Sequence, residues 1–311
     1  MKICFVGLGS IGARHFRNLG IILAERGVEY KIDALRSSDR PLPKDIEPKI
    51  HKQYTNIDEL PVDYDIAFIC TPTANHYIDI QRLEAHTKHM FIEKPIFDDI
   101  YDLNSLNLKK NAIYYVACPL RYNAVLRYLK EYIQDKKIFA ARSICSTYLP
   151  DWRPNVDYRT VYSAHKDMGG GVSIDLIHEW DYLSWLFGMP NSVKSVHGQY
   201  SDLEINSDDL ALYLGEYSDK LVSLHLDYFG RVEKREIELF TSEDTIVGDI
   251  RNSKVHFLKV GKMINFSEER NMYQLREIEH FLDLVEGKKQ NDSSIEHAVN
   301  ILKIAKGEYT A

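Results

Sequence analysis

Three glycines near the amino terminus constrain the fold more than any other feature of this chain. Residues 3–6 form an apolar run that fits a buried parallel strand, and the order G-x-G-x-x-G follows, after which a helical pattern begins. The first glycine permits a tight turn, the second lets the backbone approach a pyrophosphate, and the third lets the helix pack against the strand. The helix amino terminus then points at the phosphates, which predicts a dinucleotide site. The residues expected to contact the cofactor here are Gly7, Gly9, Ser10, Ile11 and Gly12.

The length and composition indicate a two-domain protein that is neither strongly basic nor strongly acidic. We place the division of the 311 residues at 1–119 and 120–311. Lys and Arg total 39 against 46 for Asp and Glu, and the net charge of -7 argues against a nucleic-acid-binding protein. The four cysteines lack C-x-x-C spacing, so we expect buried thiols and no metal site. The first strand begins without a signal peptide, and no apolar run has the length of a membrane span, which predicts a cytoplasmic protein with no membrane partner.

The end of the second predicted strand, Val28–Leu35, bears on the choice between the two nicotinamide cofactors. An acidic residue at this point usually binds the ribose 2′-hydroxyl, whereas an Arg with hydroxyl neighbours suits a 2′-phosphate. Arg36 and Ser37 lie just beyond the strand, while Asp33 has the right spacing from the glycines but lies inside it. The pattern therefore favours NADP over NAD, with Arg36 holding the phosphate. NAD, or a solvated Arg36 without a ligand, remains an alternative.

Two further strands end in residues suited to a ligand site. Residues 41–61 contain four prolines and are expected to be mostly a connection, with a short helical turn at 57–60. Strands at 65–70 and 90–92 follow, and the carboxyl ends of parallel strands form the ligand-binding edge of an α/β sheet. The added candidates for cofactor contact are Thr71, Pro72, His76, Glu93 and Lys94. His76 is alternatively a residue of the helix start with no ligand contact.

The order of the glycine turn, T-P-x-x-x-H at 71–76 and E-K-P at 93–95 resembles the Gfo/Idh/MocA oxidoreductase family. The segment YVACPLRY at 115–122 and a later glycine-rich segment also fit, so the resemblance covers essentially the whole chain. It implies an α/β protein with an N-terminal Rossmann domain and a C-terminal α/β domain built on a largely antiparallel open sheet. In that family the lysine of E-K-P sits beside the nicotinamide and the substrate, which implies a catalytic role for Lys94. A lysine held there can polarise a substrate oxygen, and Arg121 becomes a candidate for substrate contact.

An irregular, aromatic and polar loop marks the second half of the chain. A helix is expected at 123–134 and a strand at 137–149, and the loop follows at 151–164. Aromatic faces cover sugar CH groups or bases, and guanidinium groups bind phosphate or carboxylate, so this loop suits a carbohydrate or nucleotide. Its candidate substrate residues are Trp152, Arg153, Tyr158, Arg159 and Tyr162. A loop packed by its own aromatic residues at a domain or subunit interface is the alternative.

A glycine run at 169–171 precedes a predicted helix that ends at Gly188 and carries Asp175, His178 and Asp181 along one side. The family has the form D-x-x-x-H-x-x-D, in which the histidine exchanges the proton of the reacting hydroxyl. This chain has one residue fewer between Asp175 and His178, whereas the spacing from His178 to Asp181 is kept. The resemblance therefore implies that His178 is the general base. Asp175 is a candidate catalytic and substrate-binding residue whose role stays open, and Asp181 either orients the imidazole or caps local structure.

The remainder of the chain indicates a sheet closed by two helices. Short turns separate its strands, which predicts largely antiparallel pairing. The expected strands are 193–200, 210–216, 221–228, 233–241, 244–249 and 255–260, and the helices are 272–286 and 295–306. In the family the open face of this sheet commonly joins subunits, which implies a homo-oligomer, a dimer or a tetramer.

Together these features predict an oxidoreductase that moves a hydride between a nicotinamide and a carbohydrate carbon bearing a hydroxyl or ketone. A sugar nucleotide or an acidic sugar is the expected substrate, with Lys94 on the reacting oxygen and His178 on its proton. One alternative is a reductase of an imine or another non-sugar substrate. The other is a non-catalytic sensor that binds a dinucleotide or sugar, but such a sensor has no need of both Lys94 and His178.

Overall fold

The computed structural model describes residues 1–38 and 40–310, and they divide into two compact units. Unit 1 consists of Met1–Pro119 together with Gln274–Val299. Unit 2 consists of Leu120–Tyr273 together with the described residues from Asn300 onward. Each unit contains one sheet, and a late segment of the chain therefore belongs to the first unit.

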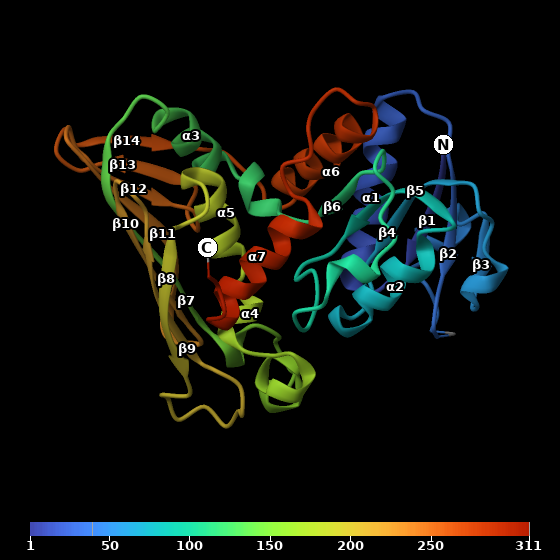
Figure 1. The fold of residues 1–311 in the computed structure, drawn as a ribbon, viewed down its shortest axis with the longest axis horizontal. Helices are drawn as coiled ribbons and strands as arrows, with labels where there is room; N and C mark the ends of the chain where they lie inside the picture. Colours follow the sequence, from blue (N-terminus) through green and yellow to red (C-terminus); the bar gives the residue numbers. More distant parts are fainter. Residues whose placement is uncertain (39, 311) are drawn as a thin grey trace. The chain divides into compact units, whose positions relative to one another are not determined.

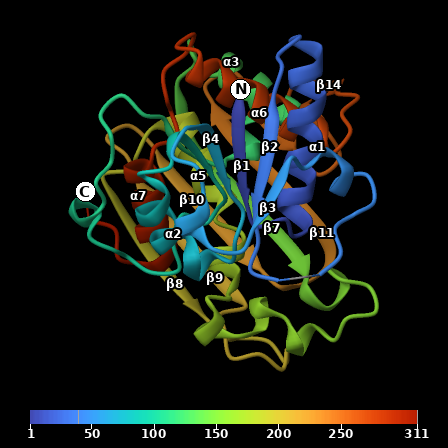
Figure 2. The ribbon, with the colours of Figure 1, turned by 90° about the vertical axis from the view of Figure 1, so that its right-hand side faces the viewer.

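Unit 1 contains a doubly wound parallel sheet (Figures 1 and 2). Six of the described strands pair in the order β3-β2-β1-β4-β5-β6, all of them parallel. Their bounds are β1 (Lys2–Val6), β2 (Lys31–Leu35), β3 (Lys52–Tyr54), β4 (Tyr64–Ile69), β5 (Thr87–Ile92) and β6 (Tyr114–Val116). The strand order reverses between β1 and β4, which is the order of a Rossmann fold. The predicted Rossmann domain is confirmed.

A row of aromatic side chains forms the core on one face of this sheet. Phe5, Phe68, Phe91 and Tyr115 are register partners on four neighbouring strands, and the Phe5 and Phe68 rings are stacked at 4.6 Å. Phe16 of α1 (Ser10–Glu25) and Phe281 of α6 (Met272–Val285) pack onto the row. Each buried Phe contributes about 1.5–3 kcal/mol of transfer free energy. This row therefore attaches both helices to the same sheet face.

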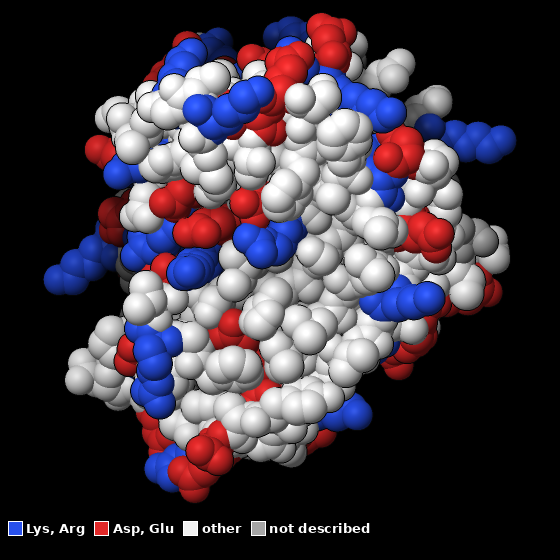
Figure 3. Space-filling view, turned by 90° about the vertical axis from the view of Figure 1, so that its left-hand side faces the viewer, with Lys and Arg blue, Asp and Glu red and all other residues white. Residues whose placement is uncertain are grey.

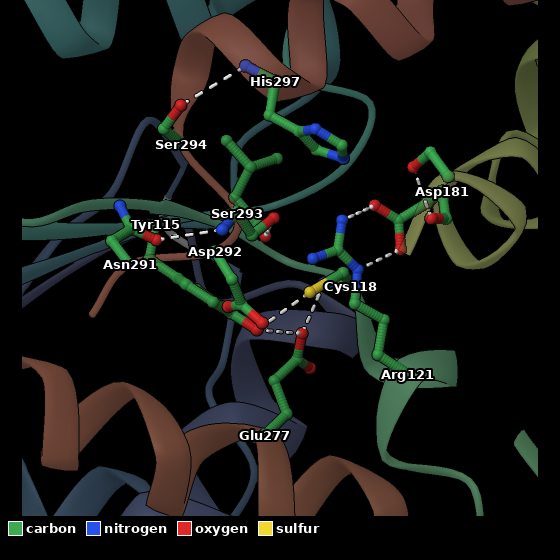
Figure 4. Close-up of polar contacts among 12 residues, drawn as sticks. Tyr115, Cys118, Arg121, Asp181, Glu277, Asn291, Asp292, Ser293, Ser294 and His297 are labelled. Atoms are coloured by element: carbon green, nitrogen blue, oxygen red, sulfur yellow. Dashed lines mark hydrogen bonds and ion pairs between the residues drawn. The ribbon is translucent and has the colours of Figure 1, made fainter. Parts of the chain in front are cut away.

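Hydrogen bonds connect the late segment of unit 1 to β6 (Figure 4). Glu277 of α6 is fully buried, and its carboxylate accepts hydrogen bonds from the backbone N–H of Cys118 and, at 3.4 Å, from the Tyr115 hydroxyl. The Ser293 hydroxyl donates to the Val116 carbonyl at 2.7 Å. A buried carboxylate without such donors would be strongly destabilising.

The segment predicted to be a connection, residues 41–61, contains the short strand β3, so the prediction missed one strand. β3 has three residues, of which only Tyr54 is buried, and such an edge strand has no hydrophobic period to reveal it. The predicted helical turn is confirmed as a turn of 3-10 helix at Ile57–Glu59.

Unit 2 contains a larger, mostly antiparallel sheet (Figure 1). Eight of the described strands pair in the order β14-β13-β12-β11-β7-β10-β9-β8, and of these pairs only β7 with β10 is parallel. Their bounds are β7 (Ile138–Tyr148), β8 (Ser192–Gly198), β9 (Leu210–Glu216), β10 (Leu221–Asp227), β11 (Phe229–Thr241), β12 (Thr245–Asp249), β13 (Lys254–Phe257) and β14 (Lys262–Asn265). The predicted largely antiparallel sheet is confirmed. The sequence missed β14, because its residues are mostly exposed and follow directly on the turn at Gly261.

Helices cover one face of this sheet and leave the other open. The buried indole of Trp180 in α5 (His178–Phe187) meets Tyr213 of β9 edge-on at 5.7 Å. Leu129 of α3 (Ala124–Tyr132) lies against Gly248 of β12, where an added β-carbon would come within 2.7 Å of it. In the last helix, α7 (Ile295–Lys306), the Ala305 carbonyl accepts a hydrogen bond from Tyr213 at 2.8 Å. On the opposite face the side chains Val196, Leu212, Leu214 and Leu221 are exposed.

The single helix predicted between the glycine run and Gly188 is in fact two helices, and this part of the prediction is wrong. α4 (Val172–Asp175) ends at Leu176, which leaves the helical region with φ −97° and ψ 23°, and α5 starts at His178. His178 and Asp181 share α5, but Asp175 belongs to α4. Asp175 makes tertiary contacts at this break, described below, which no helical period records.

The four cysteines are buried with free thiols. Within residues 1–38 and 40–310, no helix combines the length and the apolar character needed to cross a membrane. The same residues contain no cluster of His, Cys, Asp and Glu arranged to hold a metal ion.

Candidate active site

The carboxyl ends of the parallel strands in unit 1 bring the predicted cofactor residues to one edge. The last residues of four strands, Val6, Leu35, Ile69 and Ile92, are register partners of one another across the sheet. The residues that follow them include Gly7, Arg36, Thr71, Glu93 and Lys94. Backbone bonds extend the alignment past the strands, because Gly7 N–H donates to the Leu35 carbonyl at 3.0 Å and Cys70 N–H to that of Val6 at 2.8 Å.

The three glycines of the turn have different local surroundings. Gly7 has φ +87°, and an added β-carbon would lie 2.9 Å from the Cys70 carbonyl oxygen. At Gly12 an added β-carbon would lie 2.4 Å from the carbonyl oxygen of Gly7. At Gly9 it would meet nothing within 4 Å. The fold itself therefore requires Gly7 and Gly12, while Gly9 borders open space at the start of α1.

The amino terminus of α1 fits an anionic ligand. Its first N–H groups have no partner within the helix, its N-cap residue Gly9 has no side chain to cap them, and its first turn contains no acidic residue. Ser10 is exposed there and Ile11 is half-buried. Backbone donors and the helix dipole favour a phosphate at such a terminus, so these residues fit the pyrophosphate of a dinucleotide.

Arg36 follows the last residue of β2, at the edge of the sheet where the parallel strands have their carboxyl ends. Its guanidinium donates hydrogen bonds to the side-chain oxygen of Gln53, at 2.8 Å, and to the carbonyl of Arg40. Ser37 beside it is exposed. The guanidinium is thus oriented by neighbours of its own unit, with a hydroxyl next to it.

Asp33, the acidic alternative for the ribose contact, is buried in the middle of β2. Its carboxylate accepts hydrogen bonds from the Tyr64 hydroxyl at 2.7 Å and faces His51 Nδ1 at 3.0 Å. Burial, together with the hydrogen bond to Asp33, raises the pKa of Tyr64. Because both carboxylate oxygens have partners inside the unit, Asp33 is poorly placed for a ribose hydroxyl.

His76 connects two of the strand-end turns and is almost fully buried. Its Nε2 lies 3.0 Å from the Thr71 carbonyl, and its Nδ1 lies 3.1 Å from the carbonyl of Pro95. The Thr71 hydroxyl donates to Asp79 at 2.6 Å, and Pro72 precedes the short helical turn before α2 (His76–Leu83). The structure thus shows His76 as a buried residue that connects the two turns.

The turn that carries Lys94 is held by a buried pair. The Lys94–Pro95 peptide is cis. His15 Nε2 contacts one carboxylate oxygen of Glu93, and the N–H of Lys94 donates to the other at 3.1 Å. Burial acts to raise the pKa of Glu93, but the hydrogen bond and charge of His15 and the charge of Lys94 outweigh it and hold the pKa below its ordinary value. Glu93 is therefore an ionised anchor for the turn. The sequence reasoning missed His15, although its place one turn after Gly12 on the sheet side of α1 was a usable signal.

In unit 2, Asp175 is the centre of a polar and aromatic cluster. Its carboxylate accepts a hydrogen bond from Tyr228 at 2.5 Å, and it also interacts with the Tyr162 hydroxyl. Burial, and then the charge of Asp175, raises the pKa of both tyrosines. Trp152 meets the Tyr228 ring edge-on at 5.2 Å, and the Arg153 guanidinium lies 5.6 Å from the Tyr162 ring centre. The structure brings these predicted residues together and adds Tyr228, which lay unremarked at the end of a predicted strand.

Glycines allow the close approach of α4 to this cluster. An added β-carbon at Gly170 would lie 2.0 Å from the Tyr162 carbonyl oxygen. At Gly171, which has φ +135°, it would lie 2.0 Å from a carboxylate oxygen of Asp208. The glycine run therefore lets α4 begin directly against the 151–164 loop.

Arg121 forms a forked ion pair with Asp181 (Figure 4). Its Nε and Nη2 donate to the two carboxylate oxygens of Asp181 at 2.9 and 2.6 Å, and Arg121 is only 2% exposed. Asp181 lies one turn after the half-buried His178 on α5. The structure thus directs Arg121, a candidate for substrate contact, at the helix that carries His178.

Two other loop residues, Tyr158 and Arg159, have partners outside the Asp175 cluster. Arg159 is half exposed and pairs with Asp157 at 2.8 Å and Glu204 at 3.0 Å. The Tyr158 hydroxyl accepts a hydrogen bond from the N–H of Glu204 at 3.2 Å. These contacts stabilise the loop itself and leave only about 10 Å³ of space around Trp152, Arg153 and Tyr158.

The fold and these sites define a two-unit protein of the dinucleotide-binding oxidoreductase class, and sequence models of one family match it. The model described as "Oxidoreductase family, NAD-binding Rossmann fold" matches residues 1–117, and the "GFO/IDH/MocA C-terminal domain" matches residues 126–247. The chain belongs to the Gfo/Idh/MocA oxidoreductase family. The predicted family is confirmed.

Individual relatives are distant but similar in fold. The myo-inositol 2-dehydrogenase of Thermotoga maritima is 26% identical over 194 residues, 60% of this chain and 55% of that protein. The chain thus spans about half the length of the curated relatives it matches. The solved UDP-N-acetylglucosamine 3-dehydrogenase GnnA from Acidithiobacillus ferrooxidans has a TM-score of 0.77 at 16% identity. The match covers 99% of this chain and 96% of that protein. The WlbA dehydrogenase from Bordetella pertussis, in complex with NADH and UDP-GlcNAcA, has a TM-score of 0.77 at 14% identity with the same coverage.

Proposed function

We propose that this chain is an NAD(P)-dependent dehydrogenase or reductase that acts on a CH–OH group of a carbohydrate. The observation that carries the proposal is the alignment of the glycine turn, Thr71 and Lys94 at one edge of the parallel sheet. A bound nicotinamide cofactor would supply the hydride acceptor or donor. The relatives named above act on, or were solved with, inositol and UDP-linked sugars, which supports a carbohydrate and, more narrowly, a sugar nucleotide or an acidic sugar.

In this proposal residues 1–119 hold the cofactor. The glycine turn and the first turn of α1 bind the pyrophosphate, and the turns at Thr71 and Glu93 border the rest of the cofactor. Arg36 and Ser37 bind a 2′-phosphate, which makes NADP the preferred cofactor over NAD. The buried, hydrogen-bonded carboxylate of Asp33 supports this preference, because it is not available to a ribose hydroxyl.

The proposed chemistry needs one cation and one base from the protein. The Lys94 ammonium hydrogen-bonds the reacting oxygen and stabilises negative charge that develops on it. A ring nitrogen of His178 takes the hydroxyl proton in the oxidation and returns it in the reduction. Asp175 orients a substrate hydroxyl by accepting its hydrogen bond, and the two tyrosines fix its carboxylate.

We propose further that residues 120–311 carry the substrate site and the contacts between subunits. Figure 3 shows the outer face of the unit 2 sheet, where a wide uncharged area lies beside clustered charges. The exposed side chains Val196, Leu212, Leu214 and Leu221 come from this face. An apolar area of this kind fits a second copy of the chain. The free, buried thiols fit the reducing cytoplasm predicted from the sequence.

A fluorescence titration with NADH and NADPH tests the cofactor site, with two glycine variants as a matched pair. Gly9→Ala introduces a methyl group into open space, so the melting temperature should hold while both cofactors bind more weakly. Gly12→Ala forces the backbone of α1 away from Gly7, so stability and binding should fall together. If the wild type binds neither cofactor, or Gly9→Ala binds both normally, the proposed site is wrong.

Turnover assays with the Lys94→Ala and His178→Ala variants test the catalytic roles. Screening of sugars and sugar nucleotides should first identify a substrate. Each variant should then lose most turnover and keep cofactor affinity. A wild type that binds cofactor but turns over no carbohydrate would instead favour the imine reductase or the sensor.

A further inference from the structure

A pocket of about 340 Å³ in unit 2 is lined by three arginines. Arg235 comes from β11, Arg251 from the turn between β12 and β13, and Arg270 from the segment before α6. Two acidic residues, Glu233 and Glu268, also line it. None of these five residues was among the candidates from the sequence.

The two acids of the pocket already have partners. Glu233 pairs with Arg251, whose Nε lies 2.8 Å from a carboxylate oxygen. Glu268 accepts hydrogen bonds from the Asn123 side chain at 2.8 Å and from the N–H of Ala124 at 2.9 Å, so it caps the start of α3. In the part of the chain that the structure describes, Arg270 makes no ion pair. The lining therefore carries three arginines against two acidic side chains, and Arg251 is the arginine that a lining acid pairs with.

Arg235 is an unusual residue for its position. It lies on the inner face of β11, where its neighbours Ile237 and Leu239 are fully buried. Its Nε lies 3.0 Å from Oε1 of the fully buried Glu179, yet among residues 1–38 and 40–310 this nitrogen has no acceptor in good hydrogen-bond geometry. Burial raises the pKa of Glu179, and the charge of Arg235 offsets only part of that rise. With 26% of its side chain still exposed, Arg235 can donate to a ligand in the pocket.

Two connections link the lining of the pocket to the first turn of α5. Glu179, against which Arg235 lies, follows His178 directly in the chain. The lining residues Leu120 and Asn123 flank Arg121, which holds Asp181 of the same helix turn. A group bound in the pocket would thus lie near the start of the helix that carries the proposed base.

We infer that this arginine pocket binds an anionic group of the substrate, a carboxylate or a phosphate. Guanidinium groups match both anions with paired hydrogen bonds, and a charge-assisted bond of this kind is roughly twice as strong as a neutral one. The volume lies at the lower end of the range for small-molecule sites, about 300–1,000 Å³, so the pocket holds the anion with an adjoining part of the ligand. This inference rests on the proposed function and narrows its substrate to an anionic carbohydrate.

Calorimetric titration with four probes tests the inference, on the protein loaded with whichever of NADPH and NADH it binds more tightly. Glucose is neutral, glucuronate carries a carboxylate, UDP-glucose carries a diphosphate, and UDP-glucuronate carries both. We expect at least one anionic probe to bind about tenfold or more tightly than glucose, the equivalent of one charge-assisted contact. Glucuronate and UDP-glucose distinguish a carboxylate from a phosphate.

The variants assign the effect to the pocket. Arg270→Gln removes an exposed arginine without an ion pair, so it should weaken the binding of the anionic probe about tenfold and leave the melting temperature unchanged. Arg235→Gln should weaken the binding of that probe as well, and its melting temperature reports how much stability is lost when the buried Glu179 loses its partner. Arg142→Gln is the matched control, because Arg142 is an exposed arginine on the outer face of the same sheet. NADH affinity should be the same in all three variants.

Two results would overturn the inference. One is that no anionic probe binds more tightly than glucose, and the other is that Arg270→Gln and Arg235→Gln bind the anionic probe as the wild type does. If the protein still binds NADH or NADPH and oxidises a neutral sugar, the proposed function survives while the anion site fails. If neither cofactor binds, the proposed function itself fails.

Discussion

The forked pair between Arg121 and Asp181 offers a sharp test of what stabilises unit 2. Arg121 is 2% exposed, and its guanidinium donates to both oxygens of Asp181 at 2.9 and 2.6 Å. Removal of the carboxylate in Asp181→Leu leaves a buried cation without its counter-charge. Breaking one side of such a buried pair typically costs about 3–5 kcal/mol. We therefore expect the free energy of unfolding, from urea titration at pH 7, to fall by about that amount.

A double variant distinguishes the cost of leaving one charge unpaired from the cost of replacing the residues at these two positions. Arg121→Met with Asp181→Leu replaces both charges by apolar groups, which in buried pairs is often neutral or stabilising. We expect it to recover most of the loss. Glu204→Ala serves as the control, since it breaks the exposed pair with Arg159 and should leave the free energy of unfolding nearly unchanged. The reasoning is refuted if Asp181→Leu costs less than about 1 kcal/mol, the usual value of a surface pair, or if the double variant is no more stable than the single one.

Three further predictions concern pH dependence, cofactor choice and assembly. Burial acts to raise the pKa of Asp227, but the hydrogen bonds to its carboxylate outweigh burial, and the pKa is lowered. The ionised carboxylate therefore stabilises the fold in full above the ordinary Asp pKa of about 3.9, and this stabilisation is lost as the pH falls below that value. Asp227→Asn should therefore be less stable at pH 7 and show a shallower acid decline in urea titrations between pH 3 and 7; an unchanged decline contradicts the assignment. Arg36→Ala should weaken NADPH binding about tenfold and leave NADH binding nearly unchanged by fluorescence titration, and equal losses for the two cofactors would rule out a phosphate contact. Leu212→Lys with Leu214→Lys should convert the proposed oligomer to a monomer in light scattering, whereas an unchanged mass would place the interface elsewhere.

Much of the fold was predictable because hydrophobic period and turn chemistry are local. The strand 210–216 and the helix 295–306 were predicted with the bounds that the structure shows. The missed strands β3 and β14 are short and mostly exposed, so they carry no such period. The predicted helix breaks at Leu176, but Leu176 and Ile177 are apolar residues that fit a helix, so the pattern gave no sign of the break.

The candidate site was predictable where it follows from sheet topology. Parallel strands that end in register place their next residues at one edge, so strand ends made Arg36 and Thr71 candidates, while Gly7 came from the glycine motif and the role of Lys94 from the family resemblance. The role of Arg235 was harder to predict from the sequence. The sequence does show that Arg235 alternates with Ile237 and Leu239 along a strand, and a charged residue on the buried face of a strand is a signal that could have been used.

The sequence by itself determined the family, the two-sheet architecture and the strand-end residues, because all of these depend on motifs and periods within a few residues of one another. Only the tertiary structure decided the partners of the charged groups: His15 with Glu93, Arg121 with Asp181 and Arg235 with Glu179. Each pair joins residues 50 or more positions apart in the chain. Because the energy of a buried charge depends on its neighbours in space, the chemistry of these groups cannot be assigned until the chain is folded.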